Sequence, residues 1–381
     1  MILRWPEGIV SGGGSAGIKA GGAPDLGIIV ANEHVEWAGT FTKNAAAAAP
    51  VRWCRALLGS SVRAIVVNSG NANACTGAEG TAATETTATA AAGAVGCAPQ
   101  EVLVASTGPI GVPLPVQRIV EAVPSVACSL GESPETFARA ILTTDTHPKL
   151  AHAGARDSRI VGVGKGAAML APNMATMLAF VATDAAVPAP AMQDALERAV
   201  ALSFDRISVD ACESTNDSVF LLSTGRVTLD DEAEWNAALQ SVCADLAEQM
   251  VRDAEGGTKL VRIRVDGADD EAAAVELGRA VAGSVLWRAA LHGGDPNWGR
   301  VLAALGAADR SLDLASLAVS VGGVRVFDRG APAGAFEDAA KEMQGDEIDV
   351  TCVVGGGSGG AEILTADLSP DYVMLNAYGT S

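Results

Sequence analysis

The stretch from Lys165 to Ala185, KGAAMLAPNMATMLAFVATDA, constrains this chain most, because it places a threonine among small and apolar residues. A threonine hydroxyl is a poor nucleophile until a base removes its proton. One solution uses the α-amino group of the same residue when threonine begins a chain. Thr176 is internal as encoded, so this chemistry requires cleavage of the Ala175–Thr176 bond. The freed amine, with a reference pKa of roughly 7.7–8.0, then suits general-base work near neutral pH.

The apolar character of this stretch also fits an ordinary buried helix or strand, so composition alone does not decide between the two interpretations. Four other stretches bear on the choice: NSGNANACTG (68–77), ASTGPIG (105–111), LTTDTHPK (142–149) and DPNWGRV (295–301), followed by a C-terminal DLSPDYVMLNAYGTS. In this order, with the threonine stretch between the third and the fourth, they resemble the ornithine acetyltransferase family (glutamate N-acetyltransferase, arginine biosynthesis bifunctional protein). In that family the bond before the threonine of an Ala-Thr-Met-Leu sequence is cut autocatalytically.

The resemblance implies an α+β fold of the self-processing, N-terminal-threonine-nucleophile type, with sheets sandwiched by helices. It implies two chains, residues 1–175 and 176–381, the second of which includes a C-terminal segment that closes over substrate. A heterotetramer of two copies of each chain is the family expectation. Independently, strands that come before and after paired helices favour α+β over strict βαβ alternation.

The implied reaction is transfer of an acetyl group from N2-acetylornithine to glutamate through a Thr176 acetyl-enzyme intermediate, without metal or cofactor. Acetyl-CoA is a second acetyl donor in bifunctional members, and relatives in secondary metabolism share the motifs but use another acceptor. Two other classes stay open. One is an N-terminal-nucleophile aminopeptidase or amidohydrolase, which releases its products to water. The other is a non-catalytic binding protein of the same fold.

Small residues in ASTGPIG leave backbone N–H groups accessible at a strand-to-turn junction, for which a plain tight turn is the simplest interpretation. The family resemblance assigns the oxyanion hole to Thr107 and Gly108. It also assigns substrate contacts to Lys165, which is otherwise a solvated loop lysine, and to either Thr143 or Thr144, which a helix-end cap would explain equally well.

Three further substrate positions follow from the resemblance. Glu255, in RDAEGGTKL, matches a family glutamate and is expected to face the side-chain ammonium of ornithine, although Gly257 stands where the family has alanine. Asn376 and Ser381 match a terminal substrate clamp, with serine where threonine is common. Chain ends are usually poorly ordered, so such a clamp runs against physical expectation. The segment VDACESTND (209–217) resembles the family only loosely and is assigned no role.

Charge and cysteine usage restrict the partners and the compartment. The 381 residues carry a formal charge of −19 without a cluster of Lys and Arg, which argues against nucleic-acid or anionic-membrane binding. Seven cysteines include no CxxC pair, which indicates a reduced, cytoplasmic protein without a cysteine zinc site. The N-terminus lacks an apolar core of signal-peptide length, so we expect neither secretion nor a membrane span.

Other chemistries fit the sequence poorly. GVGKG (162–166) is no phosphate-binding loop, because Arg159 stands where the pattern needs glycine and Gly166 where it needs Ser or Thr. The four histidines lie outside any recognisable nucleophile elbow, and neither HExxH nor clustered metal ligands occur.

Hydrophobic patterns predict the elements around these motifs. We expect strands at LGIIVA, WAGTFT, VRAIVV, 101–107, LAFVAT and SVFLLS, with a further strand at KLVRIRV, and helices over 81–95, 116–123, 134–142, 189–204, 232–252 and 269–286. The last hundred residues are predicted to be strand and turn with one helix, 334–343, and GGGSGG (355–360) to be a loose hairpin loop.

Overall fold

The computed structural model describes residues 3–170 and 177–378. Its helices are α1 (Ala49–Ala56), α2 (Gly77–Val95), α3 (Val116–Ala127), α4 (Glu135–Ala140), α5 (Ala189–Ala201), α6 (Glu232–Arg252), α7 (Glu271–Ala282), α8 (Val285–His292), α9 (Trp298–Ala308), α10 (Phe336–Glu342) and α11 (Pro370–Tyr378). Its strands are β1 (Ile9–Gly14), β2 (Leu26–Phe41), β3 (Val62–Ser69), β4 (Val102–Thr107), β5 (Lys149–Ala155), β6 (Ser158–Lys165), β7 (Leu178–Ala186), β8 (Ser218–Thr228), β9 (Leu260–Ala268), β10 (Ala318–Val321), β11 (Val324–Asp328), β12 (Ala331–Pro332), β13 (Glu347–Val353) and β14 (Gly359–Ala366).

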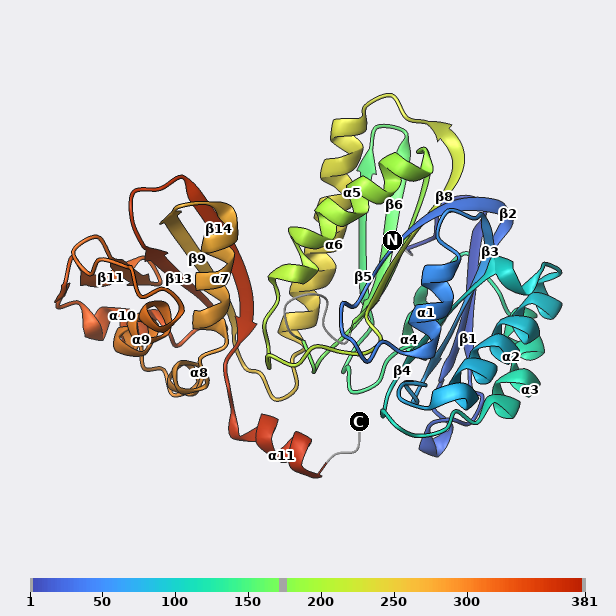
Figure 1. Cartoon of the computed structure of the whole chain (residues 1–381), viewed down its shortest axis with the longest axis horizontal. Coiled ribbons are helices and arrows are strands. Elements are labelled where there is room, and N and C mark those ends of the chain that lie inside the picture. Colours follow the sequence, from blue (N-terminus) through green and yellow to red (C-terminus); the bar gives the residue numbers. More distant parts are fainter. Residues whose placement is uncertain (1–2, 171–176, 379–381) are drawn as a thin grey trace.

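The larger unit is built on one long sheet in the order β4-β3-β2-β8-β7-β6-β5, with β1 added beside β2. β2 joins its two halves. The start of β2 pairs with β1 and β3, an irregularity falls between Val30 and Val35, and the end of the strand pairs with β8. Helices α5 and α6 pack on the β5–β8 half and helices α2 and α3 on the β1–β4 half (Figure 1). The prediction of an α+β fold with sheets sandwiched by helices is therefore confirmed.

Period-two alternation in β2 explains how its half of the sheet is buried on both faces. Leu26, Ile28 and Val30 face α2 and α3, whereas Ile29 and Ala31 face the core that the two halves of the sheet share. The other side of the β5–β8 half packs against α5 and α6. The result is two layers of strands between two layers of helices. The loops at one end of the strands surround a common space.

α2 forms although it contains many threonines, which lower helix propensity. Its buried hydroxyls are satisfied within the helix, because Thr84 donates to the carbonyl of Gly80 at 2.9 Å and Thr87 to that of Ala83 at 2.8 Å. Small side chains let this helix lie close to the sheet.

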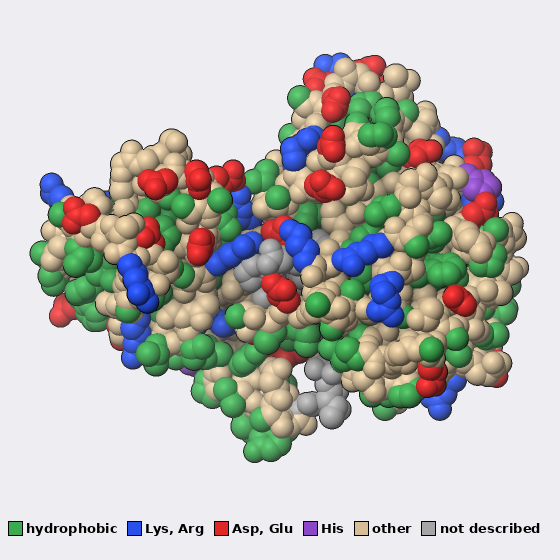
Figure 2. All heavy atoms as spheres, in the orientation of Figure 1, with side chains coloured by type: hydrophobic (Ala, Val, Ile, Leu, Met, Phe, Trp, Pro, Cys, Tyr) green, Lys and Arg blue, Asp and Glu red, His purple; other side chains and the backbone are tan. Residues whose placement is uncertain are grey.

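The smaller unit consists of a second sheet, in the order β12-β11-β10-β13-β9-β14, with α7 to α10 around it and an apolar core of its own. After β14 the chain returns as α11 beneath the larger unit (Figure 1). Acidic and basic side chains are interspersed over the face shown in Figure 2 rather than gathered by sign. No helix within the described ranges is long and apolar enough to cross a membrane.

Several local predictions were wrong. The two strands expected at LGIIVA and WAGTFT are one continuous strand, β2. The helix expected over 269–286 ends at Ala282 as α7, and a separate helix, α8, begins at Val285. The last hundred residues contain α8, α9 and α11 in addition to the expected helix, α10. The loop GGGSGG does not close a hairpin, because β9 lies between β13 and β14 and pairs with both.

Candidate active site

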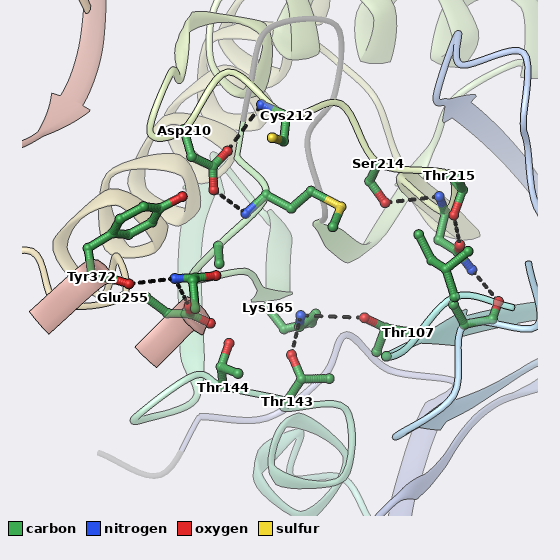
Figure 3. A pocket seen from close by; sticks show the side chains of 17 residues that line it. Thr107, Thr143, Thr144, Lys165, Asp210, Cys212, Ser214, Thr215, Glu255 and Tyr372 are labelled. Atoms are coloured by element: carbon green, nitrogen blue, oxygen red, sulfur yellow. Dashed lines mark hydrogen bonds between the residues drawn. The ribbon is translucent and has the colours of Figure 1, made fainter. Parts of the chain in front are cut away.

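A cavity of about 140 Å³ opens where loops from both sheet halves meet α11 (Figure 3). Its walls come from the turn after β4, the loop before β5, the residues after β6, the segment before β8, the end of α6, and α11. No strand or helix supplies this site alone. Its geometry therefore depends on what fixes the separate loops.

The turn after β4 brings Thr107 and Gly108 to the cavity. Gly108 has a φ of +139°, and a Cβ at this position would lie 2.4 Å from the backbone nitrogen of Asn71, so only glycine permits this close approach. The carbonyl of Thr107 accepts the Asn71 N–H at 3.0 Å, and the Thr107 side chain is buried against Lys165. The predicted oxyanion pair thus occupies a rigid, sequence-specific turn in the wall.

Buried amides of the first motif support that turn. Asn68 accepts a hydrogen bond from the Ser106 hydroxyl at 2.6 Å and donates to the carbonyl of Asn71 at 2.9 Å. The side-chain amide of Asn71 donates to the carbonyls of Val112 and Pro113 at 3.1 and 3.3 Å. Because buried polar groups that are fully paired hold one geometry, this motif fixes the backbone around Thr107.

Lys165, at the end of β6, is only 2% exposed and reaches the cavity with its ammonium. Its Nζ donates to the hydroxyl of Thr143 at 2.8 Å and lies 3.5 Å from that of Thr107. Thr143 and Thr144 both line the cavity, but the hydrogen bond to Lys165 belongs to Thr143 (Figure 3). A buried cation flanked by hydroxyls suits an anionic ligand group.

Glu255, just after α6, supplies negative charge from the opposite wall. One carboxylate oxygen accepts from the amide of Asn376 at 3.0 Å, and the other is buried and accepts no hydrogen bond from the described residues. The backbone N–H of Glu255 donates to the carbonyl of Ala167 at 2.9 Å. A buried carboxylate oxygen without a partner is costly, so it is available to a cationic ligand group.

α11 carries Asn376 against this glutamate. Gly256 has a φ of +66°, and a Cβ there would lie 2.3 Å from the backbone nitrogen of Tyr372. Only glycine at this position therefore lets α11 approach the end of α6 so closely. Ser369 fixes the start of the helix by donating to the carbonyl of Gly256 at 2.5 Å. The predicted clamp position Asn376 is therefore held in a helix, whereas chain ends are commonly disordered.

Comparison with known proteins decides the family. The model of the ArgJ family matches residues 10–381. This chain belongs to the ArgJ family. Relatives named arginine biosynthesis bifunctional protein ArgJ from Thermus thermophilus and Thermobifida fusca are each 42% identical, with 100% of both chains covered. The family predicted from the sequence motifs is confirmed.

Solved structures of two family members are similar to parts of this chain. The arginine biosynthesis bifunctional protein argJ from Bacillus halodurans is 32% identical over 51% of this chain and 95% of its own, with a TM-score of 0.49. The ornithine acetyltransferase from Mycobacterium tuberculosis, solved in complex with ornithine, is 36% identical over 45% of this chain and 97% of its own, with a TM-score of 0.43.

Most of the site residues predicted from the ArgJ resemblance share one cavity. Those that line it are Thr107, Gly108, Thr143, Lys165, Glu255 and Asn376. Ala175, Thr176 and Ser381 lie outside the described residues. Among the residues that are described, no group of three or more His, Cys, Asp or Glu side chains is placed to hold a metal ion.

The segment before β8, to which the sequence assigned no role, also lines the cavity. Asp210 accepts the N–H of Met169 at 2.5 Å and that of Cys212 at 3.2 Å, and burial raises the pKa of its carboxyl. Asn216 donates to the carbonyls of Ala72 and Ser106 at 2.6 and 2.8 Å. Acid, hydroxyl and amide residues crowded before a buried strand were the signal that could have identified this wall.

Asp217 ends this segment and connects it to the start of β7. Its Oδ1 accepts the N–H of Met177, the residue after Thr176, at 3.0 Å. Its Oδ2 is buried and has no hydrogen-bond partner among the described residues. Burial raises the pKa of Asp217 well above the ordinary aspartate value and so favours the neutral form of the carboxyl.

Proposed function

We propose that this chain transfers an acetyl group from N2-acetylornithine to glutamate through an acetyl ester on Thr176, in arginine biosynthesis. The observation that carries the proposal is the cavity itself, which in an ArgJ-family chain combines the Thr107–Gly108 turn, the Lys165 ammonium and the Glu255 carboxylate. The backbone of Met177, next to Thr176 in the chain, is anchored by Asp217 at the end of a cavity-lining segment, which supports the same assignment.

The charges of the cavity match those of the donor. N2-acetylornithine carries a carboxylate and an ammonium at its two ends, with the acetamide beside the carboxylate. Lys165 and Thr143 offer a cation and a hydroxyl for the carboxylate, and the unpaired oxygen of Glu255 accepts a charge-assisted hydrogen bond from the ammonium. Asn376 holds the other oxygen of Glu255 and so fixes the direction of that bond.

In the first half of the reaction the Thr176 hydroxyl attacks the acetyl carbonyl, and the Thr176 amine takes the hydroxyl proton. Thr107 and Gly108 stabilise the oxyanion. The carbon–nitrogen bond of the acetamide breaks, the proton passes to the departing nitrogen, and ornithine leaves while the acetyl group stays on Thr176. The glutamate amine then attacks the ester, which gives N-acetylglutamate and regenerates the hydroxyl. Glutamate must reach the ester before water does.

This chemistry requires the Thr176 amine, so we propose that the chain cuts itself between Ala175 and Thr176. The products are residues 1–175 and 176–381. We further propose that two copies of each chain form a heterotetramer in the cytoplasm, that the reaction needs no cofactor, and that acetyl-CoA serves as a second donor if the enzyme is bifunctional. Ser381 completes the clamp of Asn376 in this proposal.

Intact mass of the purified protein tests the processing step, with Thr176→Ala as the matched control. Wild type should give the two fragment masses, and the variant should stay uncut and inactive. Release of ornithine from N2-acetylornithine, measured with and without glutamate, tests the reaction. Glutamate should accelerate release and appear as N-acetylglutamate. An uncut but active wild type would overturn the mechanism, and release indifferent to glutamate would make the protein a hydrolase.

A further inference from the structure

A cluster of four charged side chains lies buried beneath the cavity. Lys165 and Lys149 are 2% and 0% exposed, and the side chains of Asp145 and Asp253 are 0% and 4% exposed. Burying charge is costly unless the charges are paired and hydrogen-bonded. Of the four, only Lys165 lines the cavity, so the other three need an explanation outside direct substrate contact.

Asp145 is the centre of this cluster. Its Oδ1 accepts from Lys149 Nζ and from the Gly166 N–H, both at 2.6 Å. Its Oδ2 accepts the Thr143 N–H at 3.0 Å and lies 3.6 Å from Lys165 Nζ. One carboxylate therefore binds the backbone on both sides of the Lys165–Thr143 contact and faces the Lys165 ammonium itself.

Lys149 connects Asp145 to the wall that carries Glu255. Its Nζ also contacts Asp253 Oδ2 at 2.5 Å, and Asp253 accepts the Thr146 N–H at 2.9 Å and the Thr146 hydroxyl. Asp253 lies two residues before Glu255, directly after α6. Lys149 and Asp253 thus hold two loops together. Of the two acids that contact Lys149, only Asp145 also lies within 4 Å of Lys165 Nζ.

The other charged groups around Lys165 give it little support. Among the described residues Asp145 is the sole carboxylate within 4 Å of its Nζ. Lys19 is a second cation whose field interacts with that of Lys165, and Lys149 lies just across Asp145. Asp217 also interacts with Lys165, but burial raises its pKa and so favours its neutral form. Without Asp145, Lys165 would be a buried cation among cations.

We propose that Asp145 is a positioning residue for acetyl transfer: it directs the Lys165 ammonium at the donor carboxylate while fixing Thr143 beside it. The inference rests on the proposed function, because it assigns Lys165 to that carboxylate. Asp145 itself touches no substrate. Its loss acts through Lys165, which separates it from a residue that merely stabilises the fold.

The experiment is the pH dependence of kcat/KM for N2-acetylornithine with saturating glutamate, in wild type, Asp145→Asn, Asp145→Glu and Asp253→Asn. An opposite charge within about 4–6 Å shifts a titration by 1–3 pH units. In Asp145→Asn the alkaline decline of kcat/KM should therefore move at least about one pH unit lower, mainly through KM. Asp145→Glu should keep the wild-type decline, because it keeps the anion.

Asp253→Asn is the matched control, since it removes the other buried carboxylate from Lys149 without touching Lys165. Its stability should fall, but its alkaline decline should coincide with that of wild type. The proposal would be overturned if kcat/KM of Asp145→Asn declined at the same alkaline pH as that of wild type. Equal shifts in Asp145→Asn and Asp253→Asn would also overturn it, because they would mean general loosening of the fold.

A double-variant comparison covers the case in which Asp145→Asn does not fold. Lys165→Met with Asp145→Asn removes one charge of each sign, so the double variant should fold and should lose no more kcat/KM than Lys165→Met alone. A further loss of tenfold or more would overturn the proposal. A wild type that transfers no acetyl group refutes the proposed function, whereas an active wild type with an unmoved decline refutes only the role of Asp145.

Discussion

Asp145 and Asp217 are two buried carboxyl groups that lie behind different walls of the same cavity, and their surroundings shift their pKa values in opposite directions. Burial alone would raise the pKa of both. At Asp145 that effect is outweighed by Lys165, Lys149 and a set of hydrogen bonds, so its pKa is held well below the ordinary value. At Asp217 the Met177 N–H, the Ser214 side chain and the charge of Lys165 together compensate too little for burial, and the pKa rises well above the ordinary value.

The difference teaches that a cation in direct contact, such as Lys149 at 2.6 Å from Asp145, can outweigh burial, whereas the weaker field of Lys165 at Asp217 does not. On the Asp145 wall, charge is retained and used to fix three loops. On the Asp217 wall, charge is suppressed beside the residue that follows Thr176. We call the first the ionic wall, in which Lys165 lines the cavity and Asp145, Lys149 and Asp253 lie behind it, and the second the neutral wall, behind which Asp217 lies.

The largest expected effect comes from removing the cation that supports the ionic wall. Lys149→Met leaves Asp145 and Asp253 buried with less compensation, so we expect the free energy of unfolding to fall by roughly 3–5 kcal/mol. Urea denaturation at pH 7 measures it. The exposed Lys43→Met is the control and should change stability by less than about 0.5 kcal/mol. A loss below about 1 kcal/mol for Lys149→Met would mean that the ionic wall contributes little.

Replacing each of the two acids by asparagine compares the two walls directly. The expected changes in stability are smaller than that of Lys149→Met. Asp145→Asn breaks a buried ion pair and should cost about 3 kcal/mol at pH 7. At Asp217 burial favours the neutral acid, and Asp217→Asn puts in its place a neutral amide that still accepts the Met177 N–H. This substitution should lower stability at pH 7 by no more than about 1 kcal/mol. Similar costs at both positions, measured by thermal and urea unfolding, would remove the contrast between the walls.

The smallest expected effect is on the pH dependence of the free energy of unfolding. The two acids contribute slopes of opposite sign, each at most about 1.4 kcal/mol per pH unit. The lowered pKa of Asp145 contributes stability that is present above about pH 3.9 and lost as the pH falls. The raised pKa of Asp217 contributes stability that is present below about pH 3.9 and lost as the pH rises. The free energy of unfolding of wild type minus that of Asp145→Asn should therefore grow from about pH 3 to 5. The free energy of unfolding of wild type minus that of Asp217→Asn should shrink above about pH 4. Parallel curves from urea unfolding would contradict both assignments.

The parts of the site that the sequence revealed were those carried by short motifs. Thr107, Lys165 and Glu255 stand in stretches that resemble the family, so their presence in one cavity could be anticipated. Asp145 and Lys149 stood in the same LTTDTHPK motif, but their partner Asp253 is 104 residues from Lys149. An ion pair of that separation exists only after folding, and a single sequence carries no sign of it.

Local pattern also explains which elements were missed. α11 begins at Pro370 after Ser369, whose hydroxyl accepts the Tyr372 N–H at 3.2 Å, so Ser-Pro-Asp was an available helix-start signal. The false hairpin at GGGSGG had no such signal. The loop chemistry suited a hairpin, and only long-range pairing through β9 places a third strand between its arms.

The position of β7 has a consequence for the protein after the proposed cut. β6 belongs to the first fragment, yet it pairs with β7 from Ile160 opposite Thr183 to Lys165 opposite Leu178, and β2 of the first fragment pairs with β8 of the second. The two fragments thus contribute neighbouring strands to one sheet and cannot dissociate unless that sheet unfolds. After unfolding they are two separate molecules that must associate before they can refold. Recovery from denaturant then becomes a bimolecular event whose yield rises with protein concentration, whereas the uncut Thr176→Ala chain refolds independently of it.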